Sequence, residues 1–423
     1  MAQLTDDCFA FSGPLLPIAE MERLIAERVV PVAEMEEVAL RDAVGRVLAA
    51  EVIAPTDVPP FDNSAVDGYA VRSGDIGTDG ETRLAIADSV AAGHAPGRAL
   101  ARGQATRIFT GAPMPAGADT VFMQEDTRVE DGVVIVPPGL DPGANRRLAG
   151  EDVRAGAVIL PAGRRLRAAH VALCAAVGLT KLTVRRRVRV AMFSTGDEII
   201  EPGAARSGAA VYDSNRYLLS GLLAGLGAEV TDLGILADRP DSLARAIADA
   251  AAWHDLVLTS GGVSNGEADH VRAAVEEIGR IVFWRLGIKP GRPVAMGVIP
   301  ARSGAGAAFV GLPGNPVAVF VTFVRVVRPL LLRLAGALPE PLVGLPVRAA
   351  FGYRKKKGRR EYVRVALRAG PNGAMEAVKF ARDGAGILTS LTETDGLVEL
   401  SEDATTIDPG AIVSFLSYAA LTG

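Results

Sequence analysis

The stretch VRVAMFSTGDE at residues 188–198 decides the fold class, because its apolar run ends abruptly in small, flexible and acidic residues. LVLTSGGVS at 256–264 and AAFVGLPGNP at 307–316 repeat the pattern. Helical periodicity separates the runs, with leucines on one face over 217–226. Over residues 185–336 this alternation predicts a mostly parallel sheet with helices on both faces, which is a three-layer α/β domain.

The residues that follow the three apolar runs suit phosphate groups. Glycines give backbone amides room to approach phosphate oxygens, and a following helix adds partial positive charge at its N-terminus. Ligands of open α/β sheets bind beyond the carboxyl ends of the strands, where such loops meet. One glycine turn alone can simply tighten a loop, so the prediction rests on all three. The candidate binding residues are Ser194, Thr195, Gly196, Ser260, Gly261, Gly262, Ser264, Pro313, Gly314, Asn315 and Pro316.

Carboxylates gather in the same part of the sequence. Glu198, Asp238 and Asp269 follow expected strands or begin expected helices, and helix capping would account for each alone. Several carboxylates beside phosphates need a counter-charge, and Mg²⁺ is the hard cation that both groups bind. We therefore predict Mg²⁺ held by these three residues. A zinc site is not expected, because the chain has two cysteines and four histidines.

The segment IKPGRP at 288–293 adds fixed positive charge. Lys289 and Arg292 stand in a loop stiffened by prolines, which suits an oxyanion. Arg285 joins them if the segment turns tightly. The alternative is an ordinary solvated loop, so the residue types alone leave this site open.

The sequence on either side of the α/β region has a different texture. Glycine and proline recur between short apolar runs over 56–149, which predicts an inserted β-rich subdomain. We expect residues 1–55 and 150–184 to form one elongated helical and β unit around it, with a helix over 40–50. Period-2 alternation over 337–423 predicts a small β-barrel.

Composition narrows the function classes. A net charge of −4 gives no overall support for nucleic-acid binding. No apolar run reaches the length of a membrane helix, and the N-terminus lacks the basic region of a secretory signal. Two cysteines do not make a disulfide framework, so the reducing cytoplasm is the expected compartment.

In combination, the motifs resemble the molybdopterin molybdenumtransferases, which are MoeA-type proteins related to the corresponding domain of gephyrin. The resemblance runs nearly end to end, and its motifs lie at 61–72, 110–115, 146–152, 194–198, 260–269, 289–293 and 312–317. It implies four subdomains, with the α/β domain as the molybdopterin-binding module, and an elongated homodimer whose active-site cleft is shared between two chains. It also implies the reaction: adenylylated molybdopterin and molybdate bind, the dithiolene takes up the metal, and AMP is released with Mg²⁺ present.

The resemblance also implies roles for individual residues. Asp62 and Thr110 belong to the β-rich subdomain, so the family's dimer would bring them to the partner's cleft. A family serine falls at Ala385, with Ser390 as the nearby hydroxyl. The implied catalytic set is Asp62, Thr110, Asp152, Glu198, Asp238, Asp269 and Lys289, and the implied substrate or oxyanion set adds Arg285, Arg359, Pro313 and Pro316.

The implied partners are the molybdopterin adenylyltransferase that makes the substrate and the apo-molybdoenzymes that take up the product. Two other interpretations remain open from the sequence. One is a non-catalytic molybdopterin-binding scaffold, and the other is a hydrolase of the competence-damage-inducible type, which shares the loops at 194–198 and 260–262. Molybdate and tungstate are too similar in size and charge for the sequence to separate them.

Overall fold

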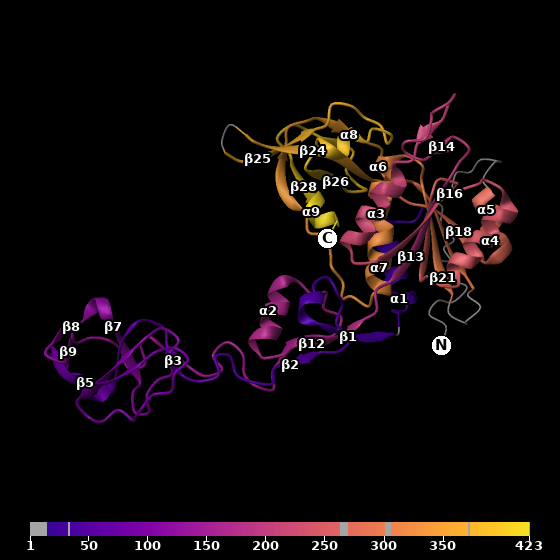
Figure 1. Cartoon of the computed structure of the whole chain (residues 1–423). Helices are drawn as coiled ribbons and strands as arrows, with labels where there is room; N and C mark the ends of the chain where they lie inside the picture. Colours follow the sequence, from indigo (N-terminus) through magenta and orange to yellow (C-terminus); the bar gives the residue numbers. More distant parts are fainter. Residues whose placement is uncertain (1–14, 33, 263–269, 301–305, 371–372, 423) are drawn as a thin grey trace.

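The protein is described by a computed structural model that covers residues 15–32, 34–262, 270–300, 306–370 and 373–422. Figure 1 shows an elongated molecule. The β-rich subdomain lies at one end, a small N-terminal unit follows it, and the α/β domain and the C-terminal barrel lie together at the other end. No helix in the described ranges is both long and apolar enough to cross a membrane.

The α/β domain is built on a six-stranded sheet. Among its described strands, only β20 is antiparallel to the others. Its first three pairings are parallel and its last two are antiparallel, so the sheet is mixed at one edge. The parallel strands carry the glycine loops at their carboxyl ends, as the sequence predicts. The order is β16 (Glu229–Leu236), β13 (Arg189–Thr195), β17 (Leu256–Ser260), β21 (Ala307–Leu312), β20 (Pro293–Ile299) and β18 (Arg280–Arg285).

Helices cover both faces of this sheet because successive strand residues point to opposite faces. Along β13, Val190 and Met192 belong to one apolar core, whereas Ala191 and Phe193 belong to the other. The first core also contains residues of α1 (Ile18–Arg28), α3 (Asn215–Gly225), α6 (Pro316–Thr322), the π-helical segment η4 (Phe323–Val327) and α7 (Arg328–Leu334). The second contains residues of α4 (Pro240–Ala251) and α5 (His270–Ile278).

Helix α1 packs in the α/β domain, although its position in the chain assigned it to the elongated N-terminal unit. Its apolar stripe of Ile18, Met21, Leu24 and Ile25 is fully buried. The stripe contacts α7 and η4, and Glu22 pairs with Arg325 at 2.9 Å. Such a stripe is stable only against a large core, which the α/β domain supplies and the N-terminal unit lacks.

The N-terminal unit is made of short paired strands. β1 (Met35–Ala39) pairs with β12 (Lys181–Arg185), and β2 (Val52–Ile53) pairs with β11 (Val158–Leu160). The expected helix over 40–50 is wrong: only the 3₁₀ turn η1 (Leu40–Asp42) forms. Gly45 then turns the chain with a φ of 81°. Helix α2 (Ala168–Ala176) completes the unit.

The β-rich subdomain has a six-stranded sheet of its own. Two short strands, β3 (Asn63–Ser64) and β10 (Arg146–Arg147), pair antiparallel where the chain enters and leaves it. The insertion is therefore attached through two adjacent chain segments. The order in its sheet is β7 (Thr120–Met123), β4 (Gly68–Val71), β6 (Gln104–Ile108), β5 (Thr82–Val90), β9 (Val133–Val136) and β8 (Arg128–Glu130).

The C-terminal strands close into a five-stranded barrel through the pairing of β24 with β26. A further short strand, β19 (Ile288–Lys289), comes from the α/β domain and adds to β24 in parallel. This pairing fastens the cationic loop of the α/β domain to the barrel wall. The barrel strands are β22 (Leu345–Ala349), β24 (Arg360–Ala369), β25 (Met375–Lys379), β26 (Gly396–Leu400) and β28 (Ile412–Ser417).

We expect the Gly68→Ala substitution to destabilise the β-rich subdomain. A Cβ at Gly68 would lie 1.8 Å from the carbonyl oxygen of Phe122 on the paired strand. Because backbone cannot yield as a side chain can, the free energy of unfolding should fall by about 1–3 kcal/mol in urea denaturation. Gly74→Ala is the control, since a Cβ there meets open space. Equal stabilities for the two variants would contradict the close approach.

Candidate functional site

A cavity of about 350 Å³ lies between the α/β domain and the barrel. The N–H of Val317 at the start of α6 donates to the carbonyl of Ala385 at 2.9 Å, so the two walls are joined beside it. Both domains therefore shape one site. The α/β wall is Lys289, Pro290, Gly291, Pro293, Pro313, Asn315 and Ala318, and the barrel wall is Tyr353, Tyr362, Arg364, Asp383, Gly384 and Ala385.

Glu361 organises the groups beside this cavity. Its side chain is 1% exposed, and it lies opposite Lys289 in the β19–β24 pairing. The ammonium of Lys289 lies 3.4 Å from its carboxylate, and Arg359 donates to it at 2.7 Å. The hydroxyl of Tyr353 donates at 2.8 Å. Burial, with this bond to Glu361, raises the pKa of Tyr353 well above its usual range. Lys289 is thus held in place while half of its side chain stays exposed.

Arg364 is the cation that the sequence interpretation missed. Its buried guanidinium donates to the Ser390 hydroxyl through Nε at 3.1 Å and to the Gly384 carbonyl through Nη2 at 3.1 Å. Arg364 and Tyr362 both belong to β24 and both line the cavity. Arg359 is not among the lining residues and pairs with Glu361 instead.

The hydroxyl of Ser390 does not take the place of the family serine. Ala385 lines the cavity, while Ser390 is fully buried behind the wall. Its Oγ accepts from Arg364 and donates to the Ile387 carbonyl at 2.6 Å. Ser390 therefore holds a cavity residue in place and does not face the cavity itself.

The loops that follow β13, β17 and β21 meet at the carboxyl-terminal edge of the sheet, where the parallel strands end, as the sequence predicts. Asn215, at the start of α3, donates to the Ser260 hydroxyl at 2.9 Å and to the Gly314 carbonyl at 2.7 Å. Gly261 has a φ of 91°, and a Cβ there would lie 2.8 Å from the Thr195 carbonyl. Only glycine allows this approach. Asn215 is a residue that sequence patterns did not single out.

Ser194, Thr195, Ser260 and the carboxylate Asp238 also belong to this edge. The first three are buried. The predicted residues Gly196, Gly262 and Pro316 follow the same strands or begin α6. Ser264 and Asp269 lie outside the described residues.

The acidic residues at this edge act on one another. Burial raises the pKa of Asp238 and the charge of His270 lowers it; Asp197 and Glu198 raise it further, and the Thr195 side chain lowers it. The Oδ1 atom of Asp238 is buried with no hydrogen-bond partner among the described residues. Within those residues no group of three or more His, Cys, Asp or Glu is placed to hold a metal. The predicted metal set includes Asp269, so the described part of the chain leaves that prediction untested.

The remaining predicted residues lie away from the cavity. Asp62 accepts from the N–H of Ala149 at 2.8 Å, and Thr110 donates through N and Oγ1 to Asp67, both at 2.8 Å. They belong to the β-rich subdomain at the far end of the molecule (Figure 1). Asp152 and Arg285 are exposed and do not line the cavity. A single chain therefore does not bring the whole predicted set together.

Three family models match the chain in succession. The MoeA N-terminal region (domains I and II) matches residues 16–178, a probable molybdopterin binding domain matches 191–333, and the MoeA C-terminal region (domain IV) matches 346–418. Together they span the N-terminal unit with its insertion, the α/β domain and the barrel. This succession defines a multidomain protein of molybdenum cofactor biosynthesis.

Similar proteins extend over nearly the whole chain. A molybdopterin molybdenumtransferase of Haemophilus influenzae is 35% identical over 395 residues, covering 92% of this chain and 95% of the relative. One from Nostoc sp. is 38% identical over 390 residues, covering 90% and 88%. The solved structure of the molybdopterin biosynthesis MoeA protein from Pyrococcus horikoshii OT3 has a TM-score of 0.80 at 30% identity, covering 96% of this chain and all (100%) of that one. The chain belongs to the MoeA family.

The Asp238→Asn substitution should stabilise the protein at neutral pH. The folded-state pKa of this carboxyl lies above its unfolded value, so ionisation costs stability as pH rises through the interval between them. Removing the charge should raise the free energy of unfolding by about 0.5–1 kcal/mol at neutral pH and change little in acid. Denaturation at several pH values measures this.

Asp241→Asn is the matched control, because Asp241 lies in the first turn of α4. A negative charge is favourable there, so the free energy of unfolding of this variant should fall by about 0.3 kcal/mol. A loss of stability for Asp238→Asn at neutral pH would show that its carboxylate is satisfied in the folded protein.

Proposed function

We propose that this chain is a molybdopterin molybdenumtransferase, which inserts molybdate into the dithiolene of adenylylated molybdopterin with hydrolysis that releases AMP. The observation that carries the proposal is the cavity where Lys289 and Arg364, from two domains, meet beside the glycine loops of the sheet. The names of the full-length relatives support it.

Molybdate is a substrate of this reaction. It is a tetrahedral dianion, which fixed cations and hydrogen-bond donors hold best. Arg364 is anchored by neutral groups, the Ser390 hydroxyl and two carbonyls, so its charge is not offset by a direct carboxylate partner among the described residues. Lys289 shares Glu361 with Arg359, and two cations on one carboxylate leave positive charge for an oxyanion.

The adenylylated pterin needs a place for its pyrophosphate next to the oxyanion. The loop after β21 supports such an arrangement, because Pro313 and Asn315 line the cavity while Gly314 is tied to Asn215 and the neighbouring Ser260 loop. Phosphates at the strand ends would thus lie close to molybdate in the cavity. Backbone amides of the glycine loops and the start of α6 are suited to hold them.

The acidic residues fit a divalent cation. The unpartnered Oδ1 of Asp238 and the mutual effect of Asp238, Asp197 and Glu198 are a charge arrangement that a cation would relieve. Asp238 and Glu198 would hold Mg²⁺, with Asp269 as the third carboxylate that the family implies. When bound, Mg²⁺ supplies positive charge to the phosphates.

The residues of this chain act by positioning and by charge. Lys289 and Arg364 hold the oxyanion against the dithiolene, whose sulfurs come from the substrate. Asn215 fixes the two loops that orient the phosphates. A carboxylate at the strand edge orients the water that attacks the phosphate linkage. No covalent bond to the enzyme is required, so rate enhancement comes from proximity and preorganised charge.

We propose that the active enzyme is a homodimer in the cytoplasm. Asp62 and Thr110 belong to the β-rich subdomain, which lies at the opposite end of the molecule from the α/β domain and the barrel (Figure 1), and this supports a site completed by a partner chain. The adenylyltransferase that makes the substrate and the apo-molybdoenzymes that receive the product are the proposed partners. The scaffold alternative differs in one respect: it would bind the pterin without releasing AMP.

Purified protein incubated with adenylylated molybdopterin, molybdate and Mg²⁺ should release AMP and form metal-loaded pterin together. Lys289→Ala and Arg364→Gln should each lower the rate about 100-fold, the usual cost of removing one donor from a preorganised anion site. Lys357→Ala is the control, because Lys357 is exposed and pairs with exposed Asp403. Removing Mg²⁺ by chelation should stop AMP release.

Tight pterin binding without AMP release or metal uptake by the wild-type protein would leave the scaffold interpretation. Unchanged rates in Lys289→Ala and Arg364→Gln would move the oxyanion site away from the cavity.

Mixing two inactive variants tests the shared cleft. Asp62→Asn and Lys289→Ala chains should each be nearly inactive alone and should regain activity when mixed, because each mixed dimer contains one intact cleft. Random exchange of subunits should restore about a quarter of the wild-type activity. Failure to recover activity, in preparations shown by mass spectrometry to contain mixed dimers, would place both residues in a cleft of one chain.

A further inference from the structure

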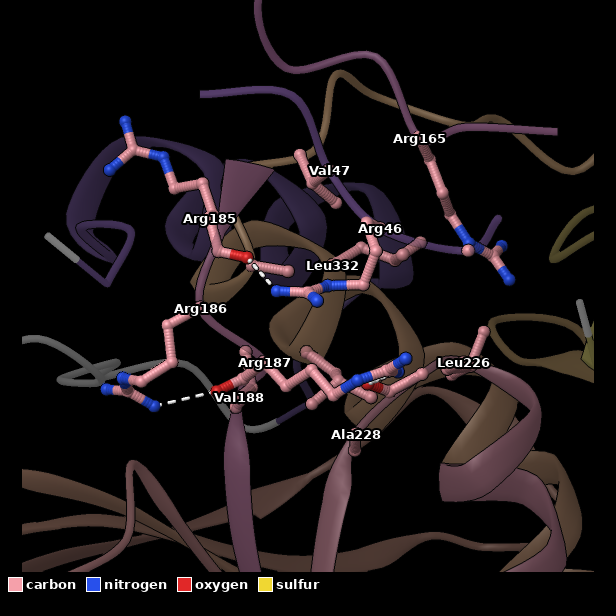
Figure 2. Close-up of a pocket in the computed structure, with 14 residues that line it drawn as sticks. Arg46, Val47, Arg165, Arg185, Arg186, Arg187, Val188, Leu226, Ala228 and Leu332 are labelled. Carbon is pink, nitrogen blue, oxygen red and sulfur yellow. Dashed lines mark hydrogen bonds between the residues drawn. The ribbon is translucent and has the colours of Figure 1, made fainter. Parts of the chain in front are cut away.

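A second cavity lies at the amino-terminal ends of the parallel strands, between the N-terminal unit and the α/β domain. Figure 2 shows the arginines gathered around an adjoining pocket, next to Val188 and Ala228, which precede β13 and β16. The second cavity adjoins this pocket and has a volume of about 480 Å³. It is called the hinge cavity below. Its walls are Val44, Gly45, Arg165, Leu166, Arg167 and Ala168 from the N-terminal unit, and Arg187, Ala224, Gly225 and Gly227 on the side of the α/β domain.

The hinge cavity is positively charged. Three arginines line it, and no carboxylate is among the described residues that do. Arg187 donates to the Gly227 carbonyl at 2.9 Å and has no carboxylate partner within the described ranges. Arg165 pairs with Glu340 at 3.4 Å, but Glu340 is shared with Arg328 at the same distance. The positive charge is therefore only partly offset.

Other arginines nearby have their charge balanced by carboxylates. Arg186 lies between Asp255, at 2.8 Å, and Glu34, at 2.6 Å. Arg46 pairs with Glu36. Arg187 and Arg167 have no such acid in the described structure, although they stand within the same arginine-rich segments.

The geometry also prepares these arginines for an anion. Arg165 and Arg187 are each held by a backbone carbonyl, of Gly225 at 3.2 Å and of Gly227 at 2.9 Å. Because these side chains are already fixed, their remaining guanidinium N–H groups can bind an anion at a lower cost in conformational entropy. Ala168, the first residue of α2, adds the partial positive charge of a helix N-terminus, whereas Ala224 and Gly225 bring the partial negative charge of the C-terminal end of α3 to the facing wall.

We propose that the hinge cavity binds a compact, multivalent phosphate anion of the inorganic pyrophosphate class. A volume of about 480 Å³ falls within the range of small-molecule sites and exceeds the needs of a monatomic ion. The arginines come from two structural units, so the anion would bridge them. Binding would favour one angle of the N-terminal unit, and with it one position of the β-rich subdomain.

Calorimetric titration of the full-length protein with inorganic pyrophosphate, at constant ionic strength, tests this site. The Lys289→Ala variant is the parent, because it weakens anion binding in the catalytic cavity. Adding Arg187→Gln or Arg165→Gln should weaken pyrophosphate binding at least about tenfold, the usual worth of a charged hydrogen bond. Adding Arg245→Gln should not, because Arg245 is exposed on α4 and does not line the cavity.

Val44→Glu is a second, independent variant. Val44 lines the cavity and is half exposed, so a longer polar side chain is tolerated there. Its carboxylate would pair with the arginines of the cavity, and should abolish the same pyrophosphate-binding step that Arg187→Gln weakens, without lowering the melting temperature. The same number of binding steps, with unchanged affinities, in Arg187→Gln and Val44→Glu as in the parent would overturn the proposal, as would an equal fall in affinity in Arg245→Gln. Wild-type protein that takes up no pyrophosphate would do so too.

Discussion

The buried carboxylate of Glu361 is the constraint on which the arrangement of the site depends. A carboxyl group that is 1% exposed is costly to bury unless several donors satisfy it. Lys289, Arg359 and Tyr353 provide those donors, and Lys289 belongs to the other domain. The electrostatic requirement of one side chain therefore fixes the junction of the α/β domain and the barrel, together with the cavity between them.

The two cations of the cavity are held by different means, and the difference matters for chemistry. Lys289 is positioned by a carboxylate, which also reduces its net charge. Arg364 is positioned by a hydroxyl and by carbonyls, which fix its plane and leave its charge intact. Ser390 is important in this arrangement because it anchors the guanidinium from behind.

The sequence predicted the α/β domain well because its strands are continuous apolar runs that end in glycine loops, and both signals are local. It predicted a helix over 40–50 wrongly, since the positive φ of Gly45 and the bridge between Leu48 and Val184 override helical periodicity. The position of α1 and the presence of Arg364 in the cavity wall depend on tertiary packing. Neither can be read from a single motif.

The attachment of the β-rich subdomain has a mechanical consequence. Its entering and leaving segments pair at β2–β11, at the bridge between Val58 and Val153, and again at β3–β10. A ribbon of two hydrogen-bonded chains resists torsion much better than a single linker, yet it still bends across its thin direction. Because the two segments are paired, a tilt at their base would carry the β-rich subdomain, with Asp62 and Thr110, as one body.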